Sequence, residues 1–416
     1  MSIQSAENAS RIEQLTIYLR TERYSVSVQR EYLLIARRFI DYLESKSLAL
    51  ETVRAMHVQN FLRRGYRVFR KRRGQALPFR EWRWRYTGAV HMVLRLLHGR
   101  WPVAPAPTTA SEAFHRNIVK EYDSWLRDLR GLVPVTRSKR TKQALLFLTA
   151  LGPRGTRESL TQLSVREVDA YVKQCCIGLR RASIESCTVC LRDFLRHLHG
   201  SGHTVADLSR SVIGPRIYDH EHIPSALRPQ EVEKILEIAR QDISRTGRRD
   251  YAFLMLLSTY GLRAAEIVTL RLEDLDWKKE ILRVRHSKTG AYSELPLLRE
   301  PGEAVLQYLK KVRPKSTHRE MFLHIRAPYR PFKTGSILNC VIGARLRAAG
   351  VVPLGRKGSH AFRHARAVSL LRGAVPLKII GDVLGHTSAR STGVYLKLAT
   401  QDLRAVGLDL PKGVSP

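Results

Sequence analysis

Apolar residues recur at helical spacing through the first hundred residues. Within Ser27–Leu43, four large apolar side chains stand three or four residues apart, namely Tyr32, Ile35, Phe39 and Tyr42. The same kind of spacing predicts helices over Arg11–Glu22, Val53–Leu62 and Tyr86–Leu97. A run rich in Pro and Ala then interrupts helix formation. We therefore expect a helical domain over residues 1–101 and a linker over residues 102–110.

The next hundred residues follow a similar plan. Four pairs of positions match at a constant offset: Leu19 and Leu126, Arg20 and Arg127, Val26 and Val133, and Arg30 and Arg137. Each half also ends on Leu-His-Gly. We interpret the pattern as two related helical domains, the second over residues 111–213. The alternative is that any two units of four helices look alike.

After a second linker, over residues 214–227, the pattern changes. Helical spacing over Pro229–Ala239 and Tyr251–Tyr260 precedes two short runs with strand character, Ile281–His286 and Ser293–Leu297. A glycine in the SKTGAY segment between these runs predicts a hairpin turn. The remainder up to residue 416 is helical in pattern. The expected fold class is α+β and mostly helical, with two N-terminal helical domains and a C-terminal mixed domain, residues 228–416, that holds a small β-sheet.

Charge narrows the range of partners. The chain has 72 Lys and Arg against 37 Asp and Glu, a formal net charge of +35, and its pI is about 10.6. Such an excess favours a polyanion, because basic side chains near phosphates release condensed counterions. A highly charged surface with no partner is the alternative. No apolar run is long enough to cross a bilayer, and the start lacks the apolar core of a signal peptide. We expect a cytoplasmic protein without a membrane partner, associated with the nucleoid if bacterial.

The five cysteines are too few for a disulfide framework in a chain of this length. Cys187 and Cys190 form a CxxC pair, and Cys175 and Cys176 lie upstream, so zinc binding has to be considered. However, Cys187 shares a helical face with apolar residues such as Leu191. We favour buried thiols in a helix core and predict no metal site.

One segment is unusually basic, and its cationic side chains are predicted to contact DNA: Arg63, Arg64, Arg67, Arg70, Lys71, Arg72 and Arg73. Four aromatic residues alternate with these and neighbouring arginines, namely Tyr66, Phe69, Trp82 and Trp84. Arginines neutralise backbone phosphates, and aromatic rings can pack on sugars or bases. The alternative is a solvated basic loop whose aromatic residues lie in the core. A second basic group, Arg137, Lys139 and Arg140, is also expected to contact DNA.

Six residues of the expected C-terminal domain suit chemistry at a phosphodiester: Arg263, Lys288, His360, Arg363, His386 and Tyr395. Two arginines can hold the non-bridging oxygens and stabilise the charge of the transition state. A tyrosine that attacks phosphorus must lose a proton whose pKa is normally about 10, and an imidazole can assist. A lysine on a turn can protonate the leaving oxygen.

In their order and sequence context, these residues resemble the tyrosine recombinase, or phage integrase, family. Tyr260–Glu266, read as YGLRAAE, is similar to the family's first arginine box, and Lys288–Gly290 to its lysine hairpin. His360–His364, read as HAFRH, is similar to its second box, and Leu384–His386 followed by Tyr395 to its last. The resemblance covers roughly the last 190 residues. Ala365 and Arg366 depart from the small hydroxyl residue and the aromatic usual there, which bears on packing and not on chemistry.

The resemblance implies a site-specific DNA recombinase of a mobile element that forms a 3′-phosphotyrosine through Tyr395. By the same analogy Arg263 and Arg363 bind the phosphate, Lys288 is the general acid, His360 assists proton transfer and His386 bonds a phosphate oxygen. No cofactor is implied. The implied partners are double-stranded DNA with recombination sites, further copies of the chain in a tetramer, and accessory recombinases. Residues 111–213 are similar to the family's core-binding domain, and residues 1–101 suit an arm-type or core-binding-like domain or a protein-contact module.

Other hypotheses deserve comparison. Glu273, Asp274 and Asp276 form an acidic cluster of the kind used in two-metal nucleases, although acidic residues in such a place commonly cap or turn the chain. A catalytically idle DNA-binding protein with the same fold is a second alternative, and a type IB topoisomerase would share the chemistry. His364 is expected to have a structural role.

Overall fold

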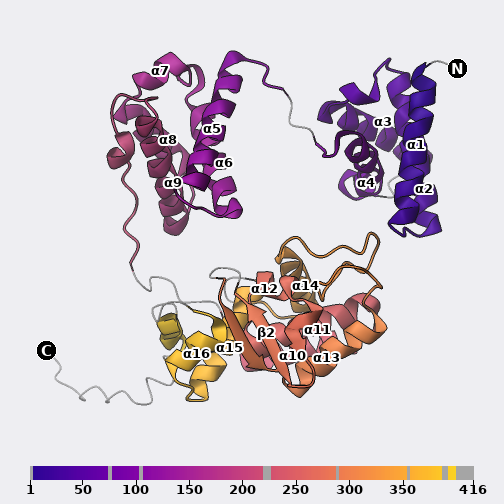
Figure 1. Cartoon of the computed structure of the whole chain (residues 1–416), viewed down its shortest axis with the longest axis vertical. Helices are drawn as coiled ribbons and strands as arrows, with labels where there is room; N and C mark the ends of the chain where they lie inside the picture. Colours follow the sequence, from indigo (N-terminus) through magenta and orange to yellow (C-terminus); the bar gives the residue numbers. More distant parts are fainter. Residues whose placement is uncertain are drawn as a thin grey trace. The chain divides into compact units, whose positions relative to one another are not determined.

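The computed structural model describes residues 3–73, 77–102, 106–218, 226–286, 290–353, 357–386 and 392–399. Residues 104–221 form one compact unit, and residues 1–103 and 222–416 are grouped in the other. Within the described residues, helices predominate and the strands form a three-stranded sheet (Figure 1). None of the helices in these ranges combines the length and apolar composition that a bilayer span requires.

The first four helices pack around one hydrophobic core. They are α1 (Ile3–Thr21), α2 (Val26–Glu44), α3 (Ala55–Arg73) and α4 (Phe79–His98), with the short 3₁₀ helix η1 (Leu50–Thr52). The hydroxyl of Ser25 caps α2 by accepting a hydrogen bond from the backbone N–H of Val28. Leu15, Phe39 and Val90 are fully buried. The helical spacing in the sequence therefore does correspond to an apolar face.

Helix α3 is longer than the sequence pattern predicts. We expected a helix only over Val53–Leu62, whereas α3 continues through the basic segment to Arg73. Arg and Lys are good helix formers, and no proline interrupts this stretch. Gly65 inside the helix permits close packing, since a Cβ there would lie 2.9 Å from the Trp82 ring. The interpretation of this segment as a loop is wrong.

The unit of residues 104–221 has a core of its own. Its helices are α5 (Ala110–Asp128), α6 (Pro134–Ala150), α7 (Arg157–Thr161), α8 (Val165–Cys175) and α9 (Arg181–Gly200), with 3₁₀ turns η2 (Gly152–Arg154) and η3 (Leu208–Ser211). Leu19 on α1 and Leu126 on α5, which match in the sequence, are both fully buried. This agrees with the idea of two related domains, which stays a prediction, as do the domain boundaries.

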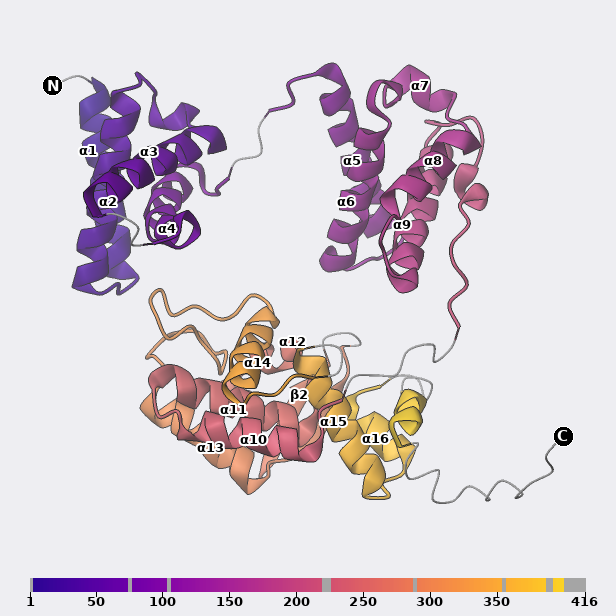
Figure 2. The same ribbon diagram turned by 180° about the vertical axis from the view of Figure 1, so that it is seen from behind.

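The C-terminal part combines helices with the sheet (Figure 2). Its helices are α10 (Pro229–Gln241), α11 (Arg245–Tyr260), α12 (Ala264–Thr269), α13 (Arg299–Lys311), α14 (Ser336–Ala348), α15 (Ser359–Arg372) and α16 (Leu377–Leu384), with 3₁₀ turns η4 (Leu272–Asp274) and η5 (Val394–Ala399). Helix α11 is central, because it packs on α10, α13 and α15 and buries most of its side chains from Ala252 to Leu257.

The sheet has strands β1 (Leu275–Asp276), β2 (Ile281–Arg285) and β3 (Tyr292–Pro296), antiparallel and in that order. Leu282 faces Leu295 across β2 and β3, and both side chains are buried. The predicted hairpin is confirmed to within one residue at each end. Residues 287–289 of its turn lie outside the described residues.

Replacing Phe322 by Ala tests this core. Phe322 is fully buried, and its ring centroid lies 4.4 Å from that of Phe253 and 5.1 Å from that of Tyr308. The cavity left by the ring should lower the free energy of unfolding by about 3–5 kcal/mol, measured by urea denaturation of the full chain. Ile243→Ala is the control: this side chain is 75% exposed, so its change should stay within about 0.5 kcal/mol. Equal effects of the two substitutions would contradict the packing described.

Candidate active site

Arg263 is fixed where one helix ends and the next begins. Helix α11 ends at Gly261, whose φ of +65° suits glycine. Arg263 then forms the N-cap of α12, and its backbone N–H and its Nη1 each donate to one oxygen of the Glu266 carboxylate, both at 2.8 Å. Its guanidinium also donates to the carbonyls of Leu384, at 3.4 Å, and Gly385, at 3.2 Å. The cation is thus held by a buried carboxylate and by the end of α16.

Arg363 lies on α15 and is almost completely buried, with 3% of its surface exposed. Its Nη1 donates to the Gly261 carbonyl at 2.8 Å, and its Nη2 donates to the Leu384 carbonyl. Burial, together with the charge of Arg263, lowers the pKa of Arg363 to about 10. The side chain therefore remains a cation at neutral pH. Both arginines donate to the Leu384 carbonyl, which places the two positive charges close together.

Tyr395 lies on η5 and is 2% exposed. Its ring packs with Ala367, Ile380 and Leu384 in a small apolar cluster. Burial raises the pKa of its hydroxyl, and the positive charges of Arg363 and Arg263 act in the opposite direction. The phenol is therefore protonated at neutral pH, beside two cations that would stabilise the phenolate.

His386 faces the same tyrosine. Its ring is stacked on that of Tyr395, with centroids 6.1 Å apart, and its Nδ1 lies 2.9 Å from the hydroxyl of the buried Thr392. Burial and the nearby charges of Arg363 and Arg263 lower the pKa of His386 to about 4. The imidazole is consequently neutral at pH 7 and can donate or accept hydrogen bonds without adding charge.

The structure thus brings together four of the six residues predicted for catalysis: Arg263, Arg363, His386 and Tyr395. Lys288 lies outside the described residues. His360 is an exposed residue in the first turn of α15, with its ring centroid 6.1 Å from that of His364. It lies one helical turn before His364, the histidine that contacts the tyrosine.

His364 is the residue that sequence reasoning missed. We expected a structural role, but its Nδ1 lies 3.2 Å from the Tyr395 hydroxyl. A signal was present in the sequence, because His364 follows His360 by four residues and therefore lies on the same face of α15. The position of His364 next to Arg363 did not by itself indicate a contact with Tyr395, which lies 31 positions after His364 in the chain.

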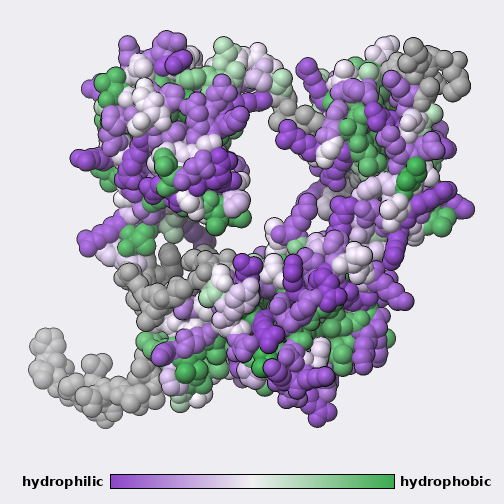
Figure 3. Space-filling view, in the orientation of Figure 1, coloured by the Kyte–Doolittle hydropathy of each residue, from purple (hydrophilic) through white to green (hydrophobic). Residues whose placement is uncertain are grey.

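The basic side chains of α3 lie on its surface. All of those predicted to contact DNA are exposed except Arg73, whose side chain lies outside the description: Arg63, Arg64, Arg67, Arg70, Lys71 and Arg72. Helix α3 has no acidic residue, and no ion pair involving these six side chains occurs within the described ranges. Four of them, Arg63, Arg64, Arg67 and Lys71, help to line a groove of about 550 Å³. Hydrophilic residues cover much of the visible surface in Figure 3.

The predicted role of the interleaved aromatic residues needs correction. Tyr66, Phe69 and Trp82 pack on the core of the first four helices, and the Tyr66 and Trp82 ring centroids are 5.5 Å apart. Hydrophobic burial holds these rings, so they are not presented to a nucleic acid. Trp84 alone among the four is mostly exposed, at 74%.

Two members of the second basic group form ion pairs within their own unit. Arg137 pairs with Asp123 at 3.4 Å, and Arg140 pairs with Asp193, which is itself buried. The two arginine side chains are only 18% and 16% exposed. These ion pairs hold both side chains within the unit, and their contact with DNA stays a prediction. Lys139 is exposed and donates to the hydroxyl of Ser186.

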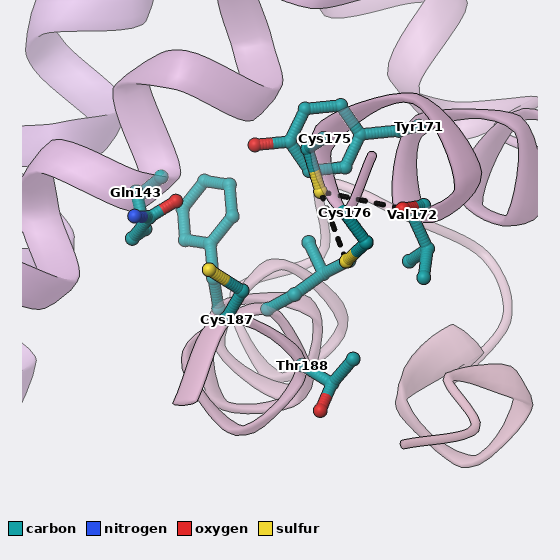
Figure 4. Close-up of a pocket in the computed structure, with 10 residues that line it drawn as sticks. Gln143, Tyr171, Val172, Cys175, Cys176, Cys187 and Thr188 are labelled. Carbon is teal, nitrogen blue, oxygen red and sulfur yellow. Dashed lines mark hydrogen bonds between the residues drawn. The ribbon is translucent and has the colours of Figure 1, made fainter. Parts of the chain in front are cut away.

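Three cysteines line a small cavity of about 10 Å³ enclosed by residues of α6, α8 and α9 (Figure 4). The sulfur atoms of Cys175 and Cys176 are 3.7 Å apart, and Cys187 lines the same cavity. Burial raises the pKa of Cys175 to about 12, and it also raises the pKa of Cys187. Zinc binds the thiolate form, which these surroundings disfavour. Across the described ranges, no group of three His, Cys, Asp or Glu is arranged to hold a metal ion.

The acidic cluster has local structural roles. Asp274 accepts a hydrogen bond from the backbone N–H of Arg271 at 2.7 Å, and Asp276 accepts one from that of Lys279 at 3.0 Å. Glu273 pairs with Arg319. These carboxylates cap and turn the chain around η4 and β1, as the second interpretation of the cluster holds.

The low pKa of His386 predicts a pH dependence of stability. Between its ordinary pKa of 6.5 and its folded pKa of about 4, the unfolded state binds the proton and the folded state does not. The contribution of His386 to the free energy of unfolding is therefore present above pH 6.5 and is lost as pH falls towards 4. In His386→Gln, the free energy of unfolding, measured by urea denaturation, should fall less steeply over this range. Part of the slope should remain, because burial also lowers the pKa of His197 to about 4. An unchanged slope would contradict the burial of a neutral His386.

The chain is similar to known proteins over most of its length. Residues 225–402 match the model of the phage integrase family. Over 391 residues the chain is 32% identical to y4rA of Sinorhizobium fredii, which is named as an integrase/recombinase. This match covers 93% of this chain and 91% of that protein. It is 25% identical to the tyrosine recombinase XerD of Lacticaseibacillus casei, over 70% of this chain and 96% of that one. The fold is similar to that of the XerH site-specific recombinase in a post-cleavage complex with its palindromic difH substrate, with a TM-score of 0.54, 15% identity and coverage of 71% and 87% of the two chains. These findings confirm the resemblance seen in the sequence and the expected fold class: the chain belongs to the phage integrase family of tyrosine recombinases.

Proposed function

We propose that this chain cuts and rejoins DNA strands at specific sites through a covalent 3′-phosphotyrosine on Tyr395. The observation that carries the proposal is the placement of the Tyr395 hydroxyl beside two buried or half-buried arginines, Arg263 and Arg363, whose charges act on its pKa. Apolar packing holds the Tyr395 ring, so the two cations are not needed to fix it. They would instead neutralise the negative charge of a phosphodiester and stabilise the phenolate that attacks it.

The two guanidiniums are assigned to the non-bridging oxygens of the scissile phosphate. They are permanently charged at neutral pH and are already oriented by carbonyls and by Glu266. Such fixed cations stabilise the added negative charge of a pentavalent transition state without having to reorganise. Neutral His386, which stacks on Tyr395, is assigned a hydrogen bond to one of the same oxygens.

Proton transfer completes the first step. The Tyr395 oxygen forms a bond to phosphorus, its proton passes to an imidazole, and the bond from phosphorus to the 5′-oxygen breaks. We assign the proton acceptance to His360, and we add His364, whose Nδ1 contacts the hydroxyl at 3.2 Å, as a group that orients the phenol. Lys288 is proposed to protonate the leaving 5′-oxygen. In the second step a 5′-hydroxyl attacks the phosphotyrosine and restores a phosphodiester, so one phosphoester replaces another and no ATP is consumed.

The proposed partners follow from the relatives. One neighbour of similar fold, with a TM-score of 0.52 and 19% identity, is a lambda integrase tetramer bound to a Holliday junction. We propose that this chain likewise acts as a tetramer on two DNA duplexes, in the service of a mobile element and with accessory recombinases. A DNA substrate would place it on the nucleoid of a bacterial host.

The exposed face of α3 is proposed as a second contact with DNA. Its six exposed cations follow one another along a helix without acidic residues, so they repel one another unless a polyanion screens them. Lys46 extends the same groove from just beyond α2. Since the core holds three of the four neighbouring aromatic rings, we propose contacts to backbone phosphates and no reading of bases by those rings.

The covalent step can be tested directly. The full chain is incubated, in EDTA, with DNA carrying its native recombination site, and protein attached to a DNA 3′ end is measured. Wild type should form the adduct, and Tyr395→Phe should form none, because it lacks the nucleophilic oxygen. An adduct of undiminished yield in Tyr395→Phe would show that another residue attacks. Lack of any adduct on a site that the protein demonstrably binds would favour an idle DNA-binding protein.

The contact through α3 predicts a change in salt dependence. If Arg63 and Arg67 each neutralise a phosphate, their joint replacement by Ala should reduce the slope of log affinity against log salt concentration by about 2. Fluorescence anisotropy with a DNA duplex measures this slope. The matched control replaces Arg240 and Arg299, which are exposed but paired with Glu237 and Glu303, and should leave the slope nearly unchanged. Equal slopes for the two double variants would remove α3 from the interface.

A further inference from the structure

One buried polar side chain beside the active site has no role in the steps above. His286 directly follows β2 and is 3% exposed. Its Nδ1 lies 3.1 Å from a carboxylate oxygen of Glu266, and its Nε2 lies 2.8 Å from the hydroxyl of Ser293. Because a carboxylate oxygen accepts hydrogen bonds, Nδ1 is the donor of the hydrogen bond to Glu266. The imidazole therefore bridges β3 and α12.

The carboxylate that His286 contacts is the one that holds Arg263. Oε1 of Glu266 accepts from both His286 Nδ1 and Arg263 Nη1, while Oε2 accepts from the Arg263 backbone. The Glu266 side chain is fully buried. The carboxylate thus accepts three hydrogen bonds, two from Arg263 and one from His286, which together fix its orientation. Among the described contacts of Glu266, loss of the imidazole would leave those to Arg263. The carboxylate would then be held less firmly, and the guanidinium would depend more on the carbonyls of Leu384 and Gly385 for its position.

The same ring also supports the last segment of the site. Gly385 has a φ of +63°, and a Cβ added there would lie within 2.3–2.5 Å of three atoms of the His286 ring. The imidazole thus packs against the backbone directly before His386. The carbonyl of Gly385 in turn accepts a hydrogen bond from Nη2 of Arg263 at 3.2 Å. The sheet, the Arg263 region and the His386 region meet at this one side chain.

We propose that His286 is a positioning residue of the recombinase, which acts through Glu266 to hold Arg263 in place for the scissile phosphate. It makes no contact with Tyr395 among those that the structure describes, and it is assigned no proton transfer. The inference rests on the proposed function, since it requires that Arg263 bind the reacting phosphate. Its distinguishing consequence is that a defect at His286 should depend on the charge of that phosphate.

The test substitutes His286 by Phe, which keeps a ring of similar size and removes both hydrogen bonds. On a normal phosphodiester, adduct formation should slow by about tenfold to a hundredfold, the scale of effect when a catalytic group is displaced slightly. On DNA with an uncharged methylphosphonate at the scissile position, Arg263 has less charge to neutralise. The defect of His286→Phe relative to wild type should therefore shrink, as should that of Arg263→Ala.

Two further variants keep the test decisive. Val305→Ala removes a fully buried side chain of α13 away from the site, so any loss of activity should be equal on both substrates. Ser293→Ala leaves the imidazole in place without its partner at Nε2 and should give a smaller defect with the same dependence on phosphate charge. If His286→Phe does not fold, the dependence of the Ser293→Ala defect on phosphate charge tests the inference in its place.

Failure of the positioning role of His286 and failure of the proposed recombinase function give different results. If wild type forms adducts and the His286 and Ser293 variants lose activity equally on both substrates, as Val305→Ala does, His286 is only a packing residue and the inference fails. If wild type forms no adduct on a bound site with either substrate, the proposed function itself fails, and the positioning role falls with it.

Discussion

The site depends on keeping two cations next to each other inside the protein. Arg363 is 3% exposed, and the fall of its pKa to about 10 reflects both its burial and the charge of Arg263. Removing such groups from water costs several kcal/mol unless they are paired and hydrogen-bonded. The protein compensates with the carbonyls of Gly261, Leu384 and Gly385 and with the Glu266 carboxylate. Among the described residues that contact the pair, only Glu266 brings a negative charge, so the two guanidiniums are not fully neutralised. The phosphate proposed to bind beside Tyr395 would supply the missing charge, so this arrangement would favour the bound substrate.

Two glycines make this arrangement of carbonyls possible. Gly261 ends α11 with a positive φ, and a Cβ there would approach a side-chain carbon of Leu384 to 2.7 Å. Gly385 ends α16 in the same conformation, against the ring of His286. The ends of two helices distant in sequence therefore come close enough for their carbonyls to converge on the same guanidiniums. Helix α11, buried on most of its sides, fixes where this convergence occurs.

The sequence revealed the parts of the site that chemistry constrains and missed those that depend on tertiary packing. An ordered set of Arg, His-x-x-Arg, His and Tyr is visible because phosphoryl transfer needs those side chains, and alternation with a glycine turn located the hairpin. The contact of His364 with Tyr395 depends instead on where η5 packs. The ion pairs of Arg137 and Arg140 depend on Asp123 and Asp193, whose proximity no local pattern expresses. The aromatic residues near α3 illustrate the same limit, since spacing among arginines could not distinguish rings held in a core from rings presented to DNA.

The positive charge of the chain therefore serves two physically different purposes. Under the proposed function, the exposed cations of α3 would act through long-range attraction and counterion release, so their contribution to binding should decrease as salt concentration rises. The buried or partly buried cations of the active site would act over a few ångströms, so their contribution to the rate should be screened far less. The acidic residues near these two groups of cations differ in the same way. Glu266 orients the partly buried cation of Arg263, whereas α3 has no acidic residue that would compete with a bound phosphate. The distribution of carboxylates thus distinguishes residues that position a phosphate from those that only attract it.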